Sequence, residues 1–130
     1  MKKLIMLSIV LIVGCGGLSN IEQEGYFKSS VRDRIFVFSF QPSVTESEIK
    51  SHAKKQTNTA GRFTACYYFK HGALIPRDGI TLAGSVFRAN NVINQFADGI
   101  EYAYMKNLNG TYSFSNCRTH PNDDLCINHQ

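Results

Sequence analysis

The chain has 130 residues, of which 43% are hydrophobic and 18% are charged, and it carries a formal net charge of +4. This length favours one domain with a single core, and nine Phe and six Tyr exclude a largely disordered chain. The charge is too small for a nucleic-acid-binding protein, in which Lys and Arg cluster strongly. We therefore expect one globular domain and no nucleic-acid partner.

The N-terminus pairs a basic segment with an apolar one. Lys2 and Lys3 precede residues 4–13, which are apolar apart from Ser8. This stretch is about half of the roughly 20 apolar residues that a transmembrane helix needs. It has the form of the hydrophobic region of a secretory signal peptide.

The four residues Ile12-Val13-Gly14-Cys15 at the end of this stretch resemble the lipobox of bacterial lipoprotein precursors. The resemblance covers only about the first 15 residues. It implies cleavage between Gly14 and Cys15, so that residues 1–14 are a lipoprotein signal peptide and Cys15 carries palmitate-type acyl chains. Each buried CH₂ of such a chain contributes about 0.8 kcal/mol, so two or three chains anchor a protein stably. The alternatives are an ordinary signal peptide with an incidental cysteine and a retained transmembrane anchor.

The same resemblance implies a destination. Lipoproteins of two-membrane bacteria are generally retained at the inner membrane by an Asp after the acylated cysteine, and here that residue is Gly16. We therefore expect an outer-membrane protein that faces the periplasm, or one on the outer face of the cytoplasmic membrane in a single-membrane host. Loss of Lys2 and Lys3 lowers the net charge from +4 to +2, so electrostatic binding to nucleic acid or anionic lipid is disfavoured.

The mature chain divides into a tether and a domain. Residues 15–30 are polar, contain Gly and lack a clear period, which predicts a lipidated flexible tether. Residues 31–130 are then a single globular domain.

The first half of this domain predicts two strands and a helix. Residues 34–40 are β-branched and aromatic on both faces, which indicates an interior strand. Thr45 and Glu48 match a capping box, so a helix is expected from Glu46 to about residue 56. Residues 62–69 alternate as a second strand.

The second half predicts a turn, three strands and a helix. Residues 76–79 have the composition of a turn and 80–83 that of a short strand, and Ser85 caps a helix over residues 86–97. Strands at 100–108 and 111–117 flank Asn109-Gly110, a strong hairpin signal. The predicted class is α+β with a small mixed or antiparallel sheet and two helices, in the order β-α-β-β-α-β-β, as in a ferredoxin-like fold.

The cysteines beyond Cys15 predict a structural disulfide. In an exported protein Cys117 and Cys126 are expected to pair across a turn-rich loop, while Cys66 is a buried small residue. The alternatives are a Cys66–Cys117 bridge, a Cys66–His catalytic pair and a zinc site, in which Cys117-x2-His120 and Cys126-x2-His129 supply the ligands. His52 is expected on the surface and His71 in a turn.

The sequence contains no Walker loop, GxGxxG, HExxH, GxSxG or EF-hand motif, and no catalytic residue, cofactor or metal is predicted. We interpret the chain as a non-enzymatic envelope lipoprotein with a protein-binding or structural role in an envelope assembly. The alternatives are a lipoprotein that binds a small ligand or metal through the Cys/His tail, and an envelope hydrolase. The terminal hairpin aromatics are either an interface or one core face of the sheet; they are Tyr102, Tyr104, Tyr112 and Phe114.

Overall fold

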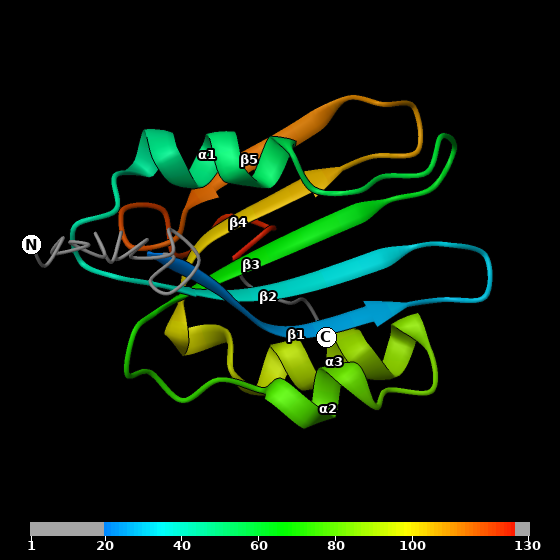
Figure 1. Cartoon of the computed structure of the whole chain (residues 1–130), viewed down its shortest axis with the longest axis horizontal. Coiled ribbons are helices and arrows are strands. Elements are labelled where there is room, and N and C mark those ends of the chain that lie inside the picture. The colour runs from blue at the N-terminus through cyan, green and yellow to red at the C-terminus, as the bar shows by residue number, and fades with distance from the viewer. Residues whose placement is uncertain (1–19, 127–130) are drawn as a thin grey trace, which may run out of the picture.

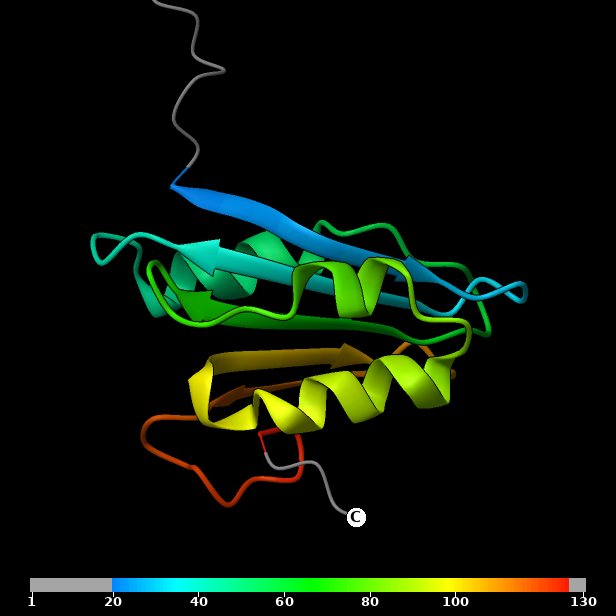
Figure 2. The same ribbon diagram turned by 90° about the horizontal axis from the view of Figure 1, so that it is seen from below.

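The fold is a five-stranded mixed sheet between helices, in a computed structural model that describes residues 20–126. α1 covers one face, and α2 and α3 lie side by side on the other (Figures 1 and 2). The predicted α+β class is confirmed. The elements of this part of the chain are β1 (Ile21–Lys28), β2 (Arg34–Phe40), α1 (Glu46–Lys54), β3 (Thr64–Lys70), α2 (Arg77–Thr81), α3 (Val86–Gln95), the 3₁₀ turn η1 (Ala97–Gly99), β4 (Ile100–Lys106) and β5 (Tyr112–Asn116).

The strand order is β1-β2-β3-β4-β5, so strands that follow one another in the chain are neighbours in the sheet. β2 and β3 are parallel and are joined through α1, while the other three pairs are antiparallel. The expected ferredoxin-like arrangement is therefore wrong, because its two βαβ units would interleave their strands. The predicted order β-α-β-β-α-β-β is only partly correct, because the observed order begins with an additional strand, β1, and has the helix α2 directly after β3.

The core has one layer on each face of the sheet. As the two-residue period of β2 predicts, its three Phe side chains face α1, whereas Ile35 and Val37 face α2 and α3. α1 contributes Ile49 and Ala53 to its layer, and its predicted capping box is present: the Thr45 hydroxyl accepts from the Glu48 N–H at 3.2 Å. The sheet thus separates two apolar layers. The capping box stabilises the first turn of α1.

The predicted tether is partly a strand, because residues 21–28 form β1. A bulge between Gln23 and Gly25 interrupts its alternation, which hid the strand from a search for a two-residue period. A Cβ at Gly25 would lie 3.2 Å from the Arg77 carbonyl oxygen, so glycine allows α2 to approach β1. Residues 21–28, predicted as part of the tether, are therefore part of the sheet.

The predicted strand at 80–83 is also wrong, and so is the turn before it, because residues 77–81 form α2. Pro76 is the N-cap residue of this helix, and Ile80 is fully buried against the sheet. A Cβ at Gly79 would lie 2.9 Å from Val92 Cγ1, so glycine lets α2 pack closely on α3. A short apolar run is compatible with either a buried strand or a buried helical turn. The close packing of α2 against β1 and α3 favours the helical turn here.

Candidate functional site

β5 is an edge strand whose outer side is open. The Asn107 N–H donates to the Thr111 oxygen at 2.7 Å, and the Cys117 N–H donates to the Glu101 oxygen at 2.9 Å. These two bonds bracket β5, so the alternation of an antiparallel ladder pairs its odd-numbered residues with β4. The even-numbered residues Tyr112, Phe114 and Asn116 consequently direct their main-chain groups outward.

Only some of the outward main-chain groups of β5 have a hydrogen-bond partner among the described residues. The Asn116 carbonyl accepts from the His120 N–H at 2.9 Å. For Tyr112 and Phe114, no described residue supplies a partner to the outward N–H and C=O groups. Strand edges of this kind are ready templates for pairing with another chain.

The opposite edge of the sheet is covered instead. The Thr81 hydroxyl of α2 accepts from the Tyr26 N–H of β1 at 3.3 Å. Arg77 of α2 donates to the Glu24 carboxylate of β1 at 2.7 Å, which adds an ion pair across the same edge. The two edges of the sheet therefore differ: α2 covers β1 at Glu24 and Tyr26, whereas β5 remains accessible at Tyr112 and Phe114.

Two lysines of α1 lie above the aromatic side chains of β5. Lys54 Nζ is 4.4 Å from the centre of the Tyr112 ring, and Lys50 Nζ is 5.7 Å from the centres of both the Tyr112 and Phe114 rings. Residues 50 and 54 share a helix face because they are one turn apart. A hydrogen bond from Lys54 and then the charge of Lys50 lower the pKa of the Tyr112 phenol.

The hairpin aromatics divide between core and surface. Tyr102 and Tyr104 are buried in the layer under α1, whereas Tyr112 is 44% exposed and stacks on Tyr104 with ring centres 5.7 Å apart. At the other end of β5, Asn116 Nδ2 donates to Glu46 at the start of α1, 2.9 Å away. α1 is thereby held over β5 along its length (Figure 1). We call the outer side of β5, with Tyr112, Lys50 and Lys54, the β5 edge surface.

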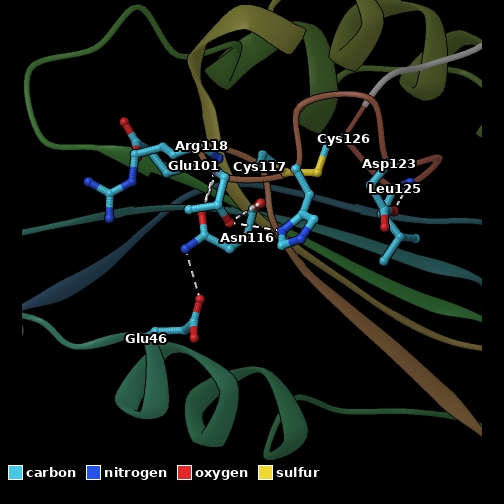
Figure 3. Close-up of a disulfide and its surroundings, with 10 residues drawn as sticks. Glu46, Glu101, Asn116, Cys117, Arg118, Asp123, Leu125 and Cys126 are labelled. Atoms are coloured by element: carbon cyan, nitrogen blue, oxygen red, sulfur yellow. Dashed lines mark hydrogen bonds and ion pairs between the residues drawn. A yellow bond between two sulfur atoms is a disulfide. The ribbon is translucent and has the colours of Figure 1, made fainter.

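The Cys/His tail forms a covalent loop beside β5. Cys117 and Cys126 are paired, with their sulfur atoms 2.07 Å and their Cα atoms 5.4 Å apart (Figure 3). Two sulfurs joined in this way cannot act as thiolate ligands. His120 Nδ1 lies 2.9 Å from the Thr119 hydroxyl, while His129 and Cys15 lie outside the described residues. Within residues 20–126, no group of His, Cys, Asp and Glu is arranged to hold a metal ion.

The free Cys66 lies under α1 and is closed to solvent. Its side chain is fully buried, as predicted, and burial raises the pKa of its thiol, so the thiolate required for nucleophilic attack is disfavoured. The alternative Cys66–Cys117 bridge is wrong, since Cys117 is bonded to Cys126.

Of the two histidines with predicted positions, His71 lies in a turn as expected. His52, expected on the surface, is half-buried. It packs edge-on against Phe38, and its Nδ1 is 2.9 Å from the Tyr68 hydroxyl. Burial, followed by the nearby charge of Lys55, lowers the pKa of His52.

A hollow of about 520 Å³ opens between α3 and the β4–β5 hairpin. Its lining carries no titratable side chain and consists of Phe63, Asn90, Met105, Asn107, Leu108 and Asn109. Neutral amides beside apolar groups suit a neutral ligand and supply neither an acid nor a base for catalysis.

No protein-family model matches this chain, and no curated protein or solved structure is significantly similar to it. Among residues 20–126, none of the helices has both the length and the apolar character to span a bilayer. Sequence reasoning identified the hairpin aromatics but missed the lysines above them, for which the only signal was their one-turn spacing after the capping box.

Proposed function

We propose that this chain is a lipid-anchored lipoprotein of the cell envelope with a non-enzymatic role, and that its domain binds a partner protein of an envelope assembly along β5. The lipobox-like residues ending at Cys15 support the anchor. The open edge of β5 carries the proposal of protein binding. The burial of Cys66 and the absence of a metal-binding cluster in the described part favour binding over catalysis.

The proposed location follows from the residue after the acylated cysteine. Gly16 stands where an Asp would favour retention at the inner membrane. We place the protein at the outer membrane, facing the periplasm, or on the outer face of the cytoplasmic membrane if the host has a single membrane.

Lipidation is tested by replacing the acylated residue. Cys15→Ser removes the thiol that the acyl chain requires, so we expect an uncleaved or mislocalised precursor that incorporates no labelled fatty acid. The measurement is incorporation of the label together with the mass of the N-terminal peptide. A Cys15→Ser protein that is still acylated and processed would contradict the proposed anchor.

The expected partner presents an extended segment. Such a segment adds to β5 through the outward main-chain groups of Tyr112 and Phe114, as in other complexes formed by strand addition. Lys50 and Lys54 lie above Tyr112 at the same edge. Because both side chains are positively charged, acidic side chains on the incoming strand are favoured. The exposed Tyr112 ring offers an apolar contact beside them.

Strand addition is tested by photo-crosslinking in cells that produce the protein. A photoreactive residue at the exposed position Ser113 should give a discrete adduct with one partner, while the same residue at Leu82, on the other side of the molecule, should not. Tyr112→Pro removes an outward N–H without removing a bond to β4, so it should abolish the adduct. Proline is tolerated at the beginning of an edge strand.

The matched control is Tyr112→Ala, which keeps the N–H and removes only the ring. We expect its adduct to be weaker but present. An adduct that is equally strong in Tyr112→Pro, or no adduct from Ser113, would overturn the proposal of strand addition.

The alternative function of small-ligand binding is supported by the hollow at the hairpin rather than by the Cys/His tail. Its lining of neutral amide and apolar side chains favours a neutral compound. If the chain binds only a small compound there, the photoreactive residue at Ser113 should give no discrete protein adduct, which separates the two functions.

A further inference from the structure

The distance between the anchor and the fold is short. The Asn20 carbonyl oxygen accepts a hydrogen bond from the Gln41 N–H at 2.9 Å, so the chain is fixed to the sheet from residue 20. Five residue steps separate Cys15 from Asn20, which allows a span of at most about 18 Å. The head-group layer itself takes up about 5–8 Å of that span. Once Cys15 is acylated, the start of β1 is therefore confined to the immediate neighbourhood of the lipid surface.

The end of the sheet at which β1 begins carries an exposed apolar loop. Ile21 pairs with Phe40, and Phe40 pairs with Lys70. Because neighbouring strands are 4.7–4.9 Å apart, Lys70 is about 10 Å from Ile21. Leu74 follows four residues later and is 79% exposed. Figure 1 shows the start of β1 and the loop after β3 at the same end of the molecule.

This loop is held in place by main-chain hydrogen bonds. The His71 N–H donates to the Phe40 oxygen at 2.9 Å, and the Ala73 N–H donates to the Lys70 oxygen at 3.0 Å. Gly72 adopts a positive φ of 86°, which the turn requires. Leu74 is thus presented from a defined turn, with Ile75 buried behind it.

The charges of the loop suit a lipid surface. Lys70 and His71 are exposed and residues 70–76 contain no acid. The first acidic residue after the loop is Asp78, in α2, and the exposed Glu22 lies next to Ile21 at the start of β1. Basic side chains beside an apolar one allow contact with phosphate groups while the apolar group enters the interface.

From these observations we infer that the Lys70–Ile75 loop contacts the membrane that holds Cys15, with Leu74 inserted among the lipid head groups. The inference rests on the proposed lipid anchor. Because the anchor makes the contact intramolecular, a single apolar side chain is sufficient at the high effective concentration of lipid. In this orientation the end of the sheet with the start of β1 and the Lys70–Ile75 loop faces the bilayer, and the β4–β5 hairpin points away from it.

The chain contains no Trp, so one introduced Trp reports on one position. The experiment uses the full acylated protein with Leu74→Trp, reconstituted in vesicles of phosphatidylethanolamine and phosphatidylglycerol, with and without brominated acyl chains. Leu82→Trp is the matched control, because Leu82 is also 79% exposed but follows α2, whose Thr81 contacts the second half of β1. We expect Leu74→Trp emission to shift to shorter wavelength and to be quenched severalfold more by brominated lipid than Leu82→Trp emission.

Vesicle flotation and the mass of the N-terminal peptide are measured on the same samples. If the protein is acylated and floats but the two Trp variants behave alike, the loop contact is overturned while the lipid anchor stands. If the protein is neither acylated nor vesicle-bound, the proposed anchor fails and the loop contact fails with it.

Discussion

Replacing Phe69 by Ala is expected to lower the free energy of unfolding by about 3–5 kcal/mol. Phe69 lies in β3, is fully buried and belongs to the core layer under α2 and α3. Its ring also contacts η1, since a Cβ at Gly99 would lie 3.1 Å from Phe69 Cδ1. A loss of this size is a large part of the about 5–15 kcal/mol that stabilises a typical domain. Urea denaturation of the soluble form that starts at Gly16 gives the measurement.

Phe87→Ala is the matched control, because Phe87 is the same side chain at 73% exposure. It should change stability by no more than about 0.5 kcal/mol. Gly99→Ala provides a second test: alone it crowds the Phe69 ring, whereas in the Phe69→Ala protein the added methyl enters the vacated space. We therefore expect the double variant to be more stable than the sum of the single changes predicts. Equal losses for Phe69→Ala and Phe87→Ala would contradict the described packing.

Reduction of the Cys117–Cys126 bond is expected to destabilise the domain by about 2–3 kcal/mol, the chain-entropy value for a loop of this length. For a domain of this size the melting temperature should fall by about 10 °C. Without reductant, the denatured soluble form should expose one thiol, that of Cys66, and the native form should expose none because Cys66 is buried. Calorimetry with and without reductant, together with thiol titration, makes the measurement.

The control is the double variant Cys117→Ser with Cys126→Ser, which should melt at the temperature of the reduced protein and respond to no reductant. Cys66→Ala should retain the full response. Three titratable thiols together with one equivalent of bound zinc would reverse this interpretation and restore the metal-site alternative for the Cys/His tail.

The sequence predicted those elements whose signals are local. β2 and α1 begin where their patterns indicate, because a doubly apolar run and a capping box depend only on neighbouring residues. The Asn109-Gly110 hairpin was found for the same reason, and Gly110 adopts the positive φ of 84° that its turn needs. β1 and α2 were missed because each depends on the other: Gly25 breaks the strand pattern so that α2 can approach.

The candidate surface could be predicted only in part. Tyr112 and Phe114 were recognised as possible contact residues from composition. Their main-chain groups are free to pair, however, only because β5 is the last strand of the sheet. Strand order is a property of long-range packing that no local pattern encodes. The position of Lys54 over the Tyr112 ring likewise follows from how α1 crosses the sheet. The pairing of Cys117 with Cys126 could be predicted from the sequence because the two residues are only 9 positions apart, so the loop between them can readily close.

The single parallel pair in the sheet has a consequence for the order in which the protein folds. The β1–β2 and β4–β5 pairs are joined by short connections, whereas β2–β3 requires closure of the segment 41–63 and β3–β4 that of 71–99. Because longer closures carry the greater entropic cost, we expect the two hairpins to form first. The Cys117–Cys126 loop is local to the second of them, while Cys66 is fifty-one residues from Cys117. Since contact probability falls roughly as the −3/2 power of separation, oxidation to the native pair is favoured about tenfold over that mispairing before the sheet is complete.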